Sequence, residues 1–132
     1  IFDNNTSHPN KTMTILIKNN HEYNIVPLPH GEGFTWSDCS LSASTIKISD
    51  YQLDHQDNRY VIVSAYKVMS ENNDQDISDN LPVKFSRYDI KLNNDDPGVS
   101  RYHWELSKSY VTKTNYIDTD EAFNHLDLSL LQ

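Results

Sequence analysis

The chain has 132 residues, the size of a single domain, and a formal net charge of −8 at pH 7. This charge argues against binding to nucleic acid or to an anionic membrane through bulk electrostatics. No run approaches the roughly 20 apolar residues that cross a bilayer, so we expect no transmembrane segment.

The composition favours β-structure over helix. Asp, Asn and Ser are abundant, and their short polar side chains favour turns over helix interiors. Only 36% of the residues are hydrophobic, but eight Tyr, four Phe and two Trp supply large apolar surfaces for a core. Cys39 is the single cysteine, so no internal disulfide can form. The chain begins with Ile1, which a removed signal peptide would explain, and we expect a secreted or extracellular location.

Residues 1–11 lack periodicity and are interpreted as a flexible N-terminal arm, followed by one β-sandwich domain over residues 12–132. Met13, Ile15 and Ile17 alternate along one predicted strand, and residues 23–28 form a second. Residues 18–21, "KNNH", suit the tight turn between them because Asn tolerates positive φ. The sequence therefore predicts a first β-hairpin.

The next segment, "PLPHGEGFTW", contains two prolines and two of the three glycines of the chain, which predicts a loop. Aromatic side chains on loops of a rigid β-scaffold commonly stack on sugars or enter lipid interfaces. His30, Phe34 and Trp36 are thus the first candidate ligand-binding residues. The alternative is that the two aromatic residues only close one end of the sandwich.

Residues 59–69 form the most apolar run, with apolar residues in both alternating positions, and predict a central strand. A long polar loop follows at residues 70–80. The apolar positions then change from odd (Leu81, Phe85) to even (Tyr88, Ile90) numbers. Such a change within one strand predicts a β-bulge, here near Ser86 and Arg87.

The segments on either side of "NNDDPG" form a second predicted hairpin. In one register, Tyr88 lies opposite Trp104, so aromatic residues are paired on one face. The same register sets Asp89 opposite His103 and Arg87 opposite Glu105, so opposite charges are paired on the other face. On the polar face, Arg101 and His103 form, with Arg87 and Lys91, a basic patch on an acidic protein. This patch is a second candidate site, suited to a sulfated, phosphorylated or carboxylated ligand.

The end of the chain combines two patterns. Asp118 and Glu121 have the spacing of a capping box, which predicts a short helix near residues 119–125. Leu126, Leu128 and Leu130 alternate and suggest a final strand. The fold class is therefore an all-β, antiparallel β-sandwich of about eight short strands, with this short helix as an option.

No catalytic, metal or cofactor motif stands out. Carboxylates at Asp54 and Asp57 and at Asp118 and Asp120 could begin a calcium loop, but turn and helix-cap roles explain them better. A lone Cys39 is typical of a small buried hydrophobic residue. We expect no enzyme activity, no cofactor and no metal.

The order of the elements and the segments "RYDIKL", "SRYHWEL" and "TKTNY" resembles the aegerolysins. That resemblance implies a small, acidic, all-β, lipid-binding protein. The chain lacks the glycine richness and the further tryptophans of that family, and no site residue is carried over from it.

Three functions are compatible with these patterns. The favoured one is a secreted or surface-exposed, non-enzymatic recognition module that binds a glycan, a lipid head group or a protein receptor, in association with a toxin for example. The second is an acidic inhibitor or immunity-type protein that blocks a basic site through its Asp-rich loop, residues 71–79. The third is a structural or coat subunit that assembles through residues 1–11.

Overall fold

Six antiparallel strands form the main sheet in a computed structural model, which describes residues 7–8, 11–19, 21–29, 32–41, 46–56, 59–69, 76–93 and 101–131. Their order is β1 (Ser7–His8), β6 (Cys39–Leu41), β7 (Lys47–Gln56), β8 (Arg59–Lys67), β9 (Val83–Leu92) and β10 (Tyr102–Val111). As predicted, β8 is an inner strand with apolar residues buried on both faces. β1 belongs to the segment expected to be a flexible arm, and the rest of residues 1–10 lies outside the described part.

Two small sheets come from the first part of the chain. β2 (Thr12–Thr14) pairs with β5 (Thr35–Ser37), and β3 (Leu16–Asn19) pairs with β4 (Glu22–Ile25). The predicted hairpin is therefore present, but its first strand is divided at Ile15 because its two halves pair with different partners. His21 has a φ of 72° in the turn.

The expected short helix is α1 (Thr119–Asn124), and the Asp118 side chain caps it by accepting a hydrogen bond of 2.8 Å from the Glu121 amide. The expected final strand is wrong: residues 128–131 form the 3-10 helix η2 (Leu128–Leu131). Asp127 starts this turn by accepting hydrogen bonds from the Ser129 amide and hydroxyl. The all-β, antiparallel sandwich is otherwise confirmed, with ten strands in the described part.

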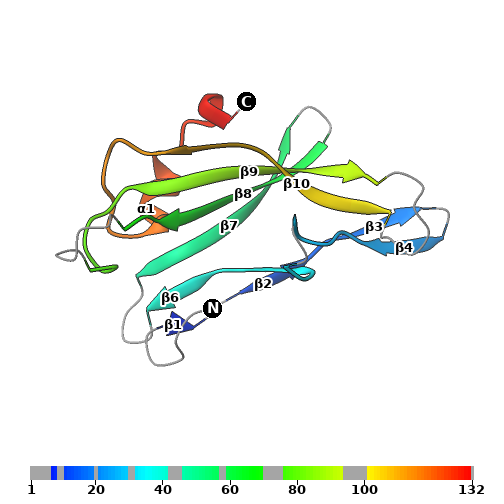
Figure 1. Cartoon of the computed structure of the whole chain (residues 1–132), viewed down its shortest axis with the longest axis horizontal. Helices are drawn as coiled ribbons and strands as arrows, with labels where there is room; N and C mark the ends of the chain where they lie inside the picture. The colour runs from blue at the N-terminus through cyan, green and yellow to red at the C-terminus, as the bar shows by residue number, and fades with distance from the viewer. Residues whose placement is uncertain are drawn as a thin grey trace.

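The apolar residues form two cores on opposite faces of the main sheet, since the neighbouring side chains Ile62 and Val63 belong to different cores. In Figure 1, α1 and the β3–β4 hairpin lie toward opposite ends of the long axis. The helix-side core is built from Val63, Ala65, Val83, Phe85, Ala122 and Leu131. The hairpin-side core is built from Val26, Tyr51, Ile62 and Trp104, with Met13, Ile15, Ile17, Leu28, Trp36, Tyr88, Ile90 and Tyr102 packed on it.

These two cores explain the change of apolar positions in β9. Phe85 packs in the helix-side core, and Tyr88 and Ile90 pack in the hairpin-side core, so β9 needs no bulge to bury all three. The predicted bulge near Ser86 and Arg87 is therefore wrong. The extra residue is Ser107 in the partner strand β10, between Leu106 and Lys108.

The predicted register of the β9–β10 hairpin is wrong by two residues. Trp104 lies opposite Ile90, and Glu105 lies opposite Asp89. A shift of two keeps every side chain on its predicted face, which is why Trp104 is still fully buried. The cross-strand charge pairs, however, are replaced: the Arg87 guanidinium Nε binds the Asp89 carboxylate at 2.9 Å along the same strand.

Asp89 connects the bulge to the sheet and, through Arg87, to the end of the described chain. Its carboxylate accepts hydrogen bonds from Arg87 and from the Ser107 hydroxyl, and Arg87 also donates to the Leu131 carbonyl at 3.3 Å. Burial opposes ionisation of Asp89, but the hydrogen bonds from Arg87 and Ser107 outweigh it and lower the pKa of the carboxyl. Asp89 is therefore ionised in the folded protein at neutral pH.

We predict that Asp89→Asn lowers the free energy of unfolding at pH 7 by about 2 kcal/mol, because hydrogen bonds to a charged group are lost. A carboxyl with a lowered pKa in the folded state stabilises the protein above its unfolded pKa, near 4. That contribution is lost as the pH falls through the lower, folded pKa. Urea titrations at pH 7 and in the acid range should show a smaller acid-induced loss in the variant, and an equal loss in both proteins would contradict this role.

Candidate functional site

A groove of about 620 Å³ runs beside the second half of β10, a volume within the range of small-molecule sites. One wall is β10 with the residues that follow it, and the other is the chain from α1 to η2. The residues that line the groove are Lys108, Ser109, Tyr110, Val111, Thr112, Lys113, Thr114, Tyr116, His125, Asp127, Ser129 and Leu130.

The charges of the groove differ from those of the whole protein. Lys108 and Lys113 contribute two positive charges to the β10 wall, and Asp127 is the single carboxylate among the described lining residues. The full chain, in contrast, has 19 acidic against 11 basic residues. The groove is thus a locally basic region that favours an anionic ligand.

Aromatic rings form the apolar part of the groove. The half-buried Tyr110 ring packs on Phe85 of the helix-side core, with ring centroids 5.6 Å apart. Burial raises the pKa of Tyr110, although a hydrogen bond with the Asp127 backbone opposes this, so the phenol is neutral at physiological pH. The Tyr116 and His125 rings stack at 5.8 Å, with an angle of 16° between their planes.

The hydroxyl groups whose contacts are defined serve the fold. The Thr112 hydroxyl donates to the Thr114 carbonyl at 2.7 Å and accepts from the Val83 amide at 3.0 Å. The Ser129 hydroxyl donates to Asp127 at 2.6 Å, and this bond, with one from the Ser129 amide, lowers the pKa of the Asp127 carboxyl. A carboxylate with a lowered pKa is a poor general base, so the Ser129–Asp127 pair is not an activated nucleophile.

The structure places Phe34 and Trp36, two of the three predicted loop residues, apart from this groove. Trp36 lies on β5 rather than in a loop, and its half-buried ring meets the rings of Tyr88 at 5.1 Å and Trp104 at 5.9 Å. Phe34 is 52% exposed, and His30 lies outside the described residues. Trp36 therefore packs on the hairpin-side core.

The second predicted pair lies at the start of β10. Arg101 is exposed and its guanidinium carbon lies 5.9 Å from the Tyr102 ring centre, and His103 Nε2 lies 4.0 Å from the Glu105 carboxylate. Trp104 contacts Trp36, but the adjacent His103 points to the opposite face of β10. Among the described candidates, Trp36 and His103 therefore lie on opposite faces of β10 and do not form one site.

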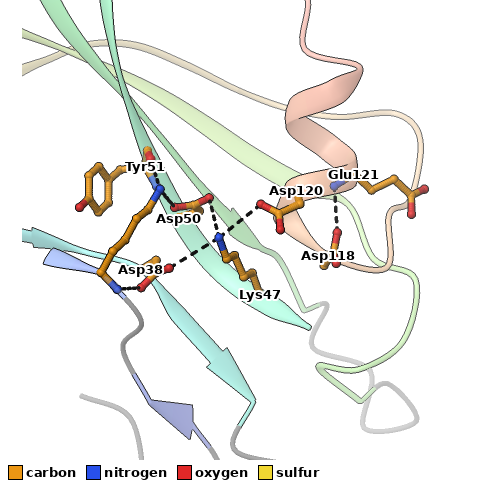
Figure 2. Close-up of polar contacts among 8 residues, drawn as sticks. Asp38, Lys47, Asp50, Tyr51, Asp118, Asp120 and Glu121 are labelled. Atoms are coloured by element: carbon orange, nitrogen blue, oxygen red, sulfur yellow. Dashed lines mark hydrogen bonds and ion pairs between the residues drawn. The ribbon is translucent and has the colours of Figure 1, made fainter. Parts of the chain in front are cut away.

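A second polar cluster fastens α1 to the sheet, as Figure 2 shows. Lys47 Nζ lies 3.7 Å from both Asp38 and Asp50, which are buried, and 3.5 Å from Asp120 of α1. Burial opposes protonation of Lys47, but the three carboxylates outweigh it and raise its pKa. Lys11 adds an ion pair of 3.1 Å to Asp50. Each carboxylate in this cluster faces a lysine, so the cluster is structural.

Two further features bear on the expected function classes. Among the residues that the structure describes, no group of three or more His, Cys, Asp or Glu side chains is placed to hold a metal ion. The helices of the described part are too short or too polar to span a bilayer. The Asp-rich loop is described only from Asp76. In that loop, the Asp79 carbonyl accepts a hydrogen bond of 2.7 Å from the buried Lys67 ammonium.

The groove could not be found from the sequence because its residues come from two segments that both have the alternating pattern of a strand. Tyr110, Thr112, Thr114 and Tyr116 alternate in the way that is typical of a continuous strand, whereas β10 ends at Val111. Asp127 and Ser129 were assigned to a final strand. The sequence "DLS" carries a signal that could have found this turn, because Asp commonly accepts a hydrogen bond from the amide two residues later.

We predict that Trp36→Ala lowers the free energy of unfolding by about 3 kcal/mol, as expected for an aromatic residue packed in a core. The matched change Phe34→Ala should stay within about 0.5 kcal/mol, because that ring is exposed. Chemical denaturation of both variants measures the difference. If Trp36→Ala left the free energy of unfolding unchanged, the packing role of Trp36 would be contradicted, and a role in ligand binding would be favoured.

Comparison with solved structures finds a protein of similar fold. The solved structure described as "Crystal structure of CarG" superposes with a TM-score of 0.80 and is 35% identical in sequence. The match covers 99% of this chain and 82% of that chain. No curated protein sequence matches significantly.

A family model described as "Carbapenem resistance protein CarG-like" matches residues 1–125. The chain therefore belongs to the CarG-like family. The segments that resemble the aegerolysins are thus part of a chain that matches the CarG-like family.

Proposed function

We propose that this protein contributes to carbapenem resistance by binding the antibiotic intact in the groove beside β10. The observation that carries the proposal is the pair Lys108 and Lys113 in a drug-sized groove of an acidic protein. The name of the family supports the choice of ligand, because it relates the family to carbapenem resistance.

The chemistry of a carbapenem fits this groove. The molecule has a compact bicyclic ring, a ring carboxylate and a lactam carbonyl. Lysine ammonium groups bind carboxylates as point charges, and each has three hydrogen-bond donors for carboxylate or carbonyl oxygens. The rings of Tyr110 and Tyr116 offer apolar surface for the bicycle.

Binding without hydrolysis is the second part of the proposal. Opening a lactam requires an activated nucleophile, and the Thr112 and Ser129 hydroxyls are engaged in hydrogen bonds that shape the groove. Protection by capture depends on protein abundance, because each bound antibiotic occupies one protein. The expected non-enzymatic recognition module thus becomes a small-molecule binder, and an extracellular location remains part of the proposal.

We predict that Lys113→Glu weakens carbapenem binding by up to about fivefold, because an ion pair near the surface contributes up to ~1 kcal/mol. The matched control is Lys18→Glu, an equal change of charge at an exposed residue of β3 that lines neither the groove nor the basic patch. Isothermal titration calorimetry gives the affinities, and lactam absorbance in the same samples reports ring opening.

Two results would contradict the proposal. Equal weakening by both variants would mean that only the net charge of the protein matters. Catalytic loss of the lactam absorbance, at many turnovers per protein molecule, would mean that the protein is a hydrolase.

Expression of the wild type in a carbapenem-sensitive bacterium should raise the inhibitory concentration, and Lys113→Glu should reduce that gain.

A further inference from the structure

The wall of the groove opposite the lysines carries a carboxylate of fixed orientation. Asp127 Oδ1 accepts from the Ser129 amide at 3.0 Å and from the Ser129 hydroxyl at 2.6 Å. These bonds hold the side chain in one position while the residue stays exposed to solvent. Both bonds go to Oδ1, and within the described part of the chain no hydrogen bond to Oδ2 is formed, so Oδ2 can accept from a ligand donor.

The backbone around Asp127 is fixed as well. Tyr110 has a hydrogen bond with the Asp127 backbone, and Tyr110 itself is packed on Phe85. Leu131, four residues later, is 2% exposed in the helix-side core, and its carbonyl accepts from Arg87. The chain is thus anchored to the main sheet at Asp127 itself and again four residues later, which is a preorganised arrangement for recognition.

The groove is therefore lined by charges of both signs, which come from two different segments. Lys108 and Lys113 come from β10 and the residues that follow it, and Asp127 comes from the turn before η2. Tyr110 and Tyr116 supply apolar surface in the same groove. A ligand that complements all of these features carries a negative group, an apolar body and a positive group.

We propose that the groove selects small zwitterions, with the ligand carboxylate at Lys108 and Lys113 and a protonated amine at Asp127. The inference rests on the proposed function and narrows it. Within the carbapenem class, the preferred ligands are those whose side chain carries a protonated amine.

The test uses two carbapenems that differ only at the side-chain nitrogen: one with a primary amine, and the same compound N-acetylated. Titration calorimetry at pH 7 should show that the wild-type protein binds the amine about fivefold more tightly than the acetylated compound. Asp127→Asn removes the charge but keeps an oxygen for the Ser129 donors. In this variant the preference should fall below twofold, while the affinity for the acetylated compound stays within twofold of wild type.

Each remaining outcome overturns a defined claim. Equal binding of the two compounds to the wild type, or a preference that survives in a folded Asp127→Asn variant, overturns the zwitterion inference and leaves the proposed function standing. Absence of binding for both compounds overturns the two proposals together. The comparison of the two compounds on the wild type needs no variant, so it decides the question even if Asp127→Asn does not fold.

Discussion

One inserted residue, Ser107, determines how β10 takes part in both cores. Side chains of a regular strand alternate, so Trp104 and Tyr110 would share a face without an insertion. With Ser107 inserted, Trp104 lies opposite Ile90 and packs in the hairpin-side core, and Tyr110 lies opposite Phe85 and packs in the helix-side core. The bulge is stabilised by the Ser107 hydroxyl on Asp89. One strand can therefore serve two cores on opposite faces of the sheet.

The groove depends on the same insertion. The inserted Ser107 directs the side chains of Lys108 and Tyr110 to the face of the sheet over which the chain from α1 to η2 passes. Arg87 bonds both to Asp89 at the bulge and to the Leu131 carbonyl, so the two walls of the groove are connected through one guanidinium group. The Lys47 cluster fixes α1 at the other end of this covering segment. The groove is thus held by the sheet itself rather than by a loose loop.

The parts of the fold that depend on local chemistry could be predicted from the sequence. The inner strand β8, the first hairpin and the Asp118 cap follow from apolar periodicity, turn residues and side-chain hydrogen bonds. The bulge could not be located, because burial of opposite faces in β9 produces the same sequence pattern as an insertion. The groove could not be predicted either, since its charges come from segments about 15 residues apart that only tertiary packing brings together.

The central claim is that an intact carbapenem binds beside β10. Its most direct test is a titration of isotope-labelled protein with a carbapenem, followed through backbone amide chemical shifts and through the proton signals of the lactam ring. We expect shifts that concentrate in residues 108–114 and 125–130 while the ring signals persist. Shifts centred on residues 32–36 or 101–103, or ring signals that disappear as the lactam opens, would contradict it.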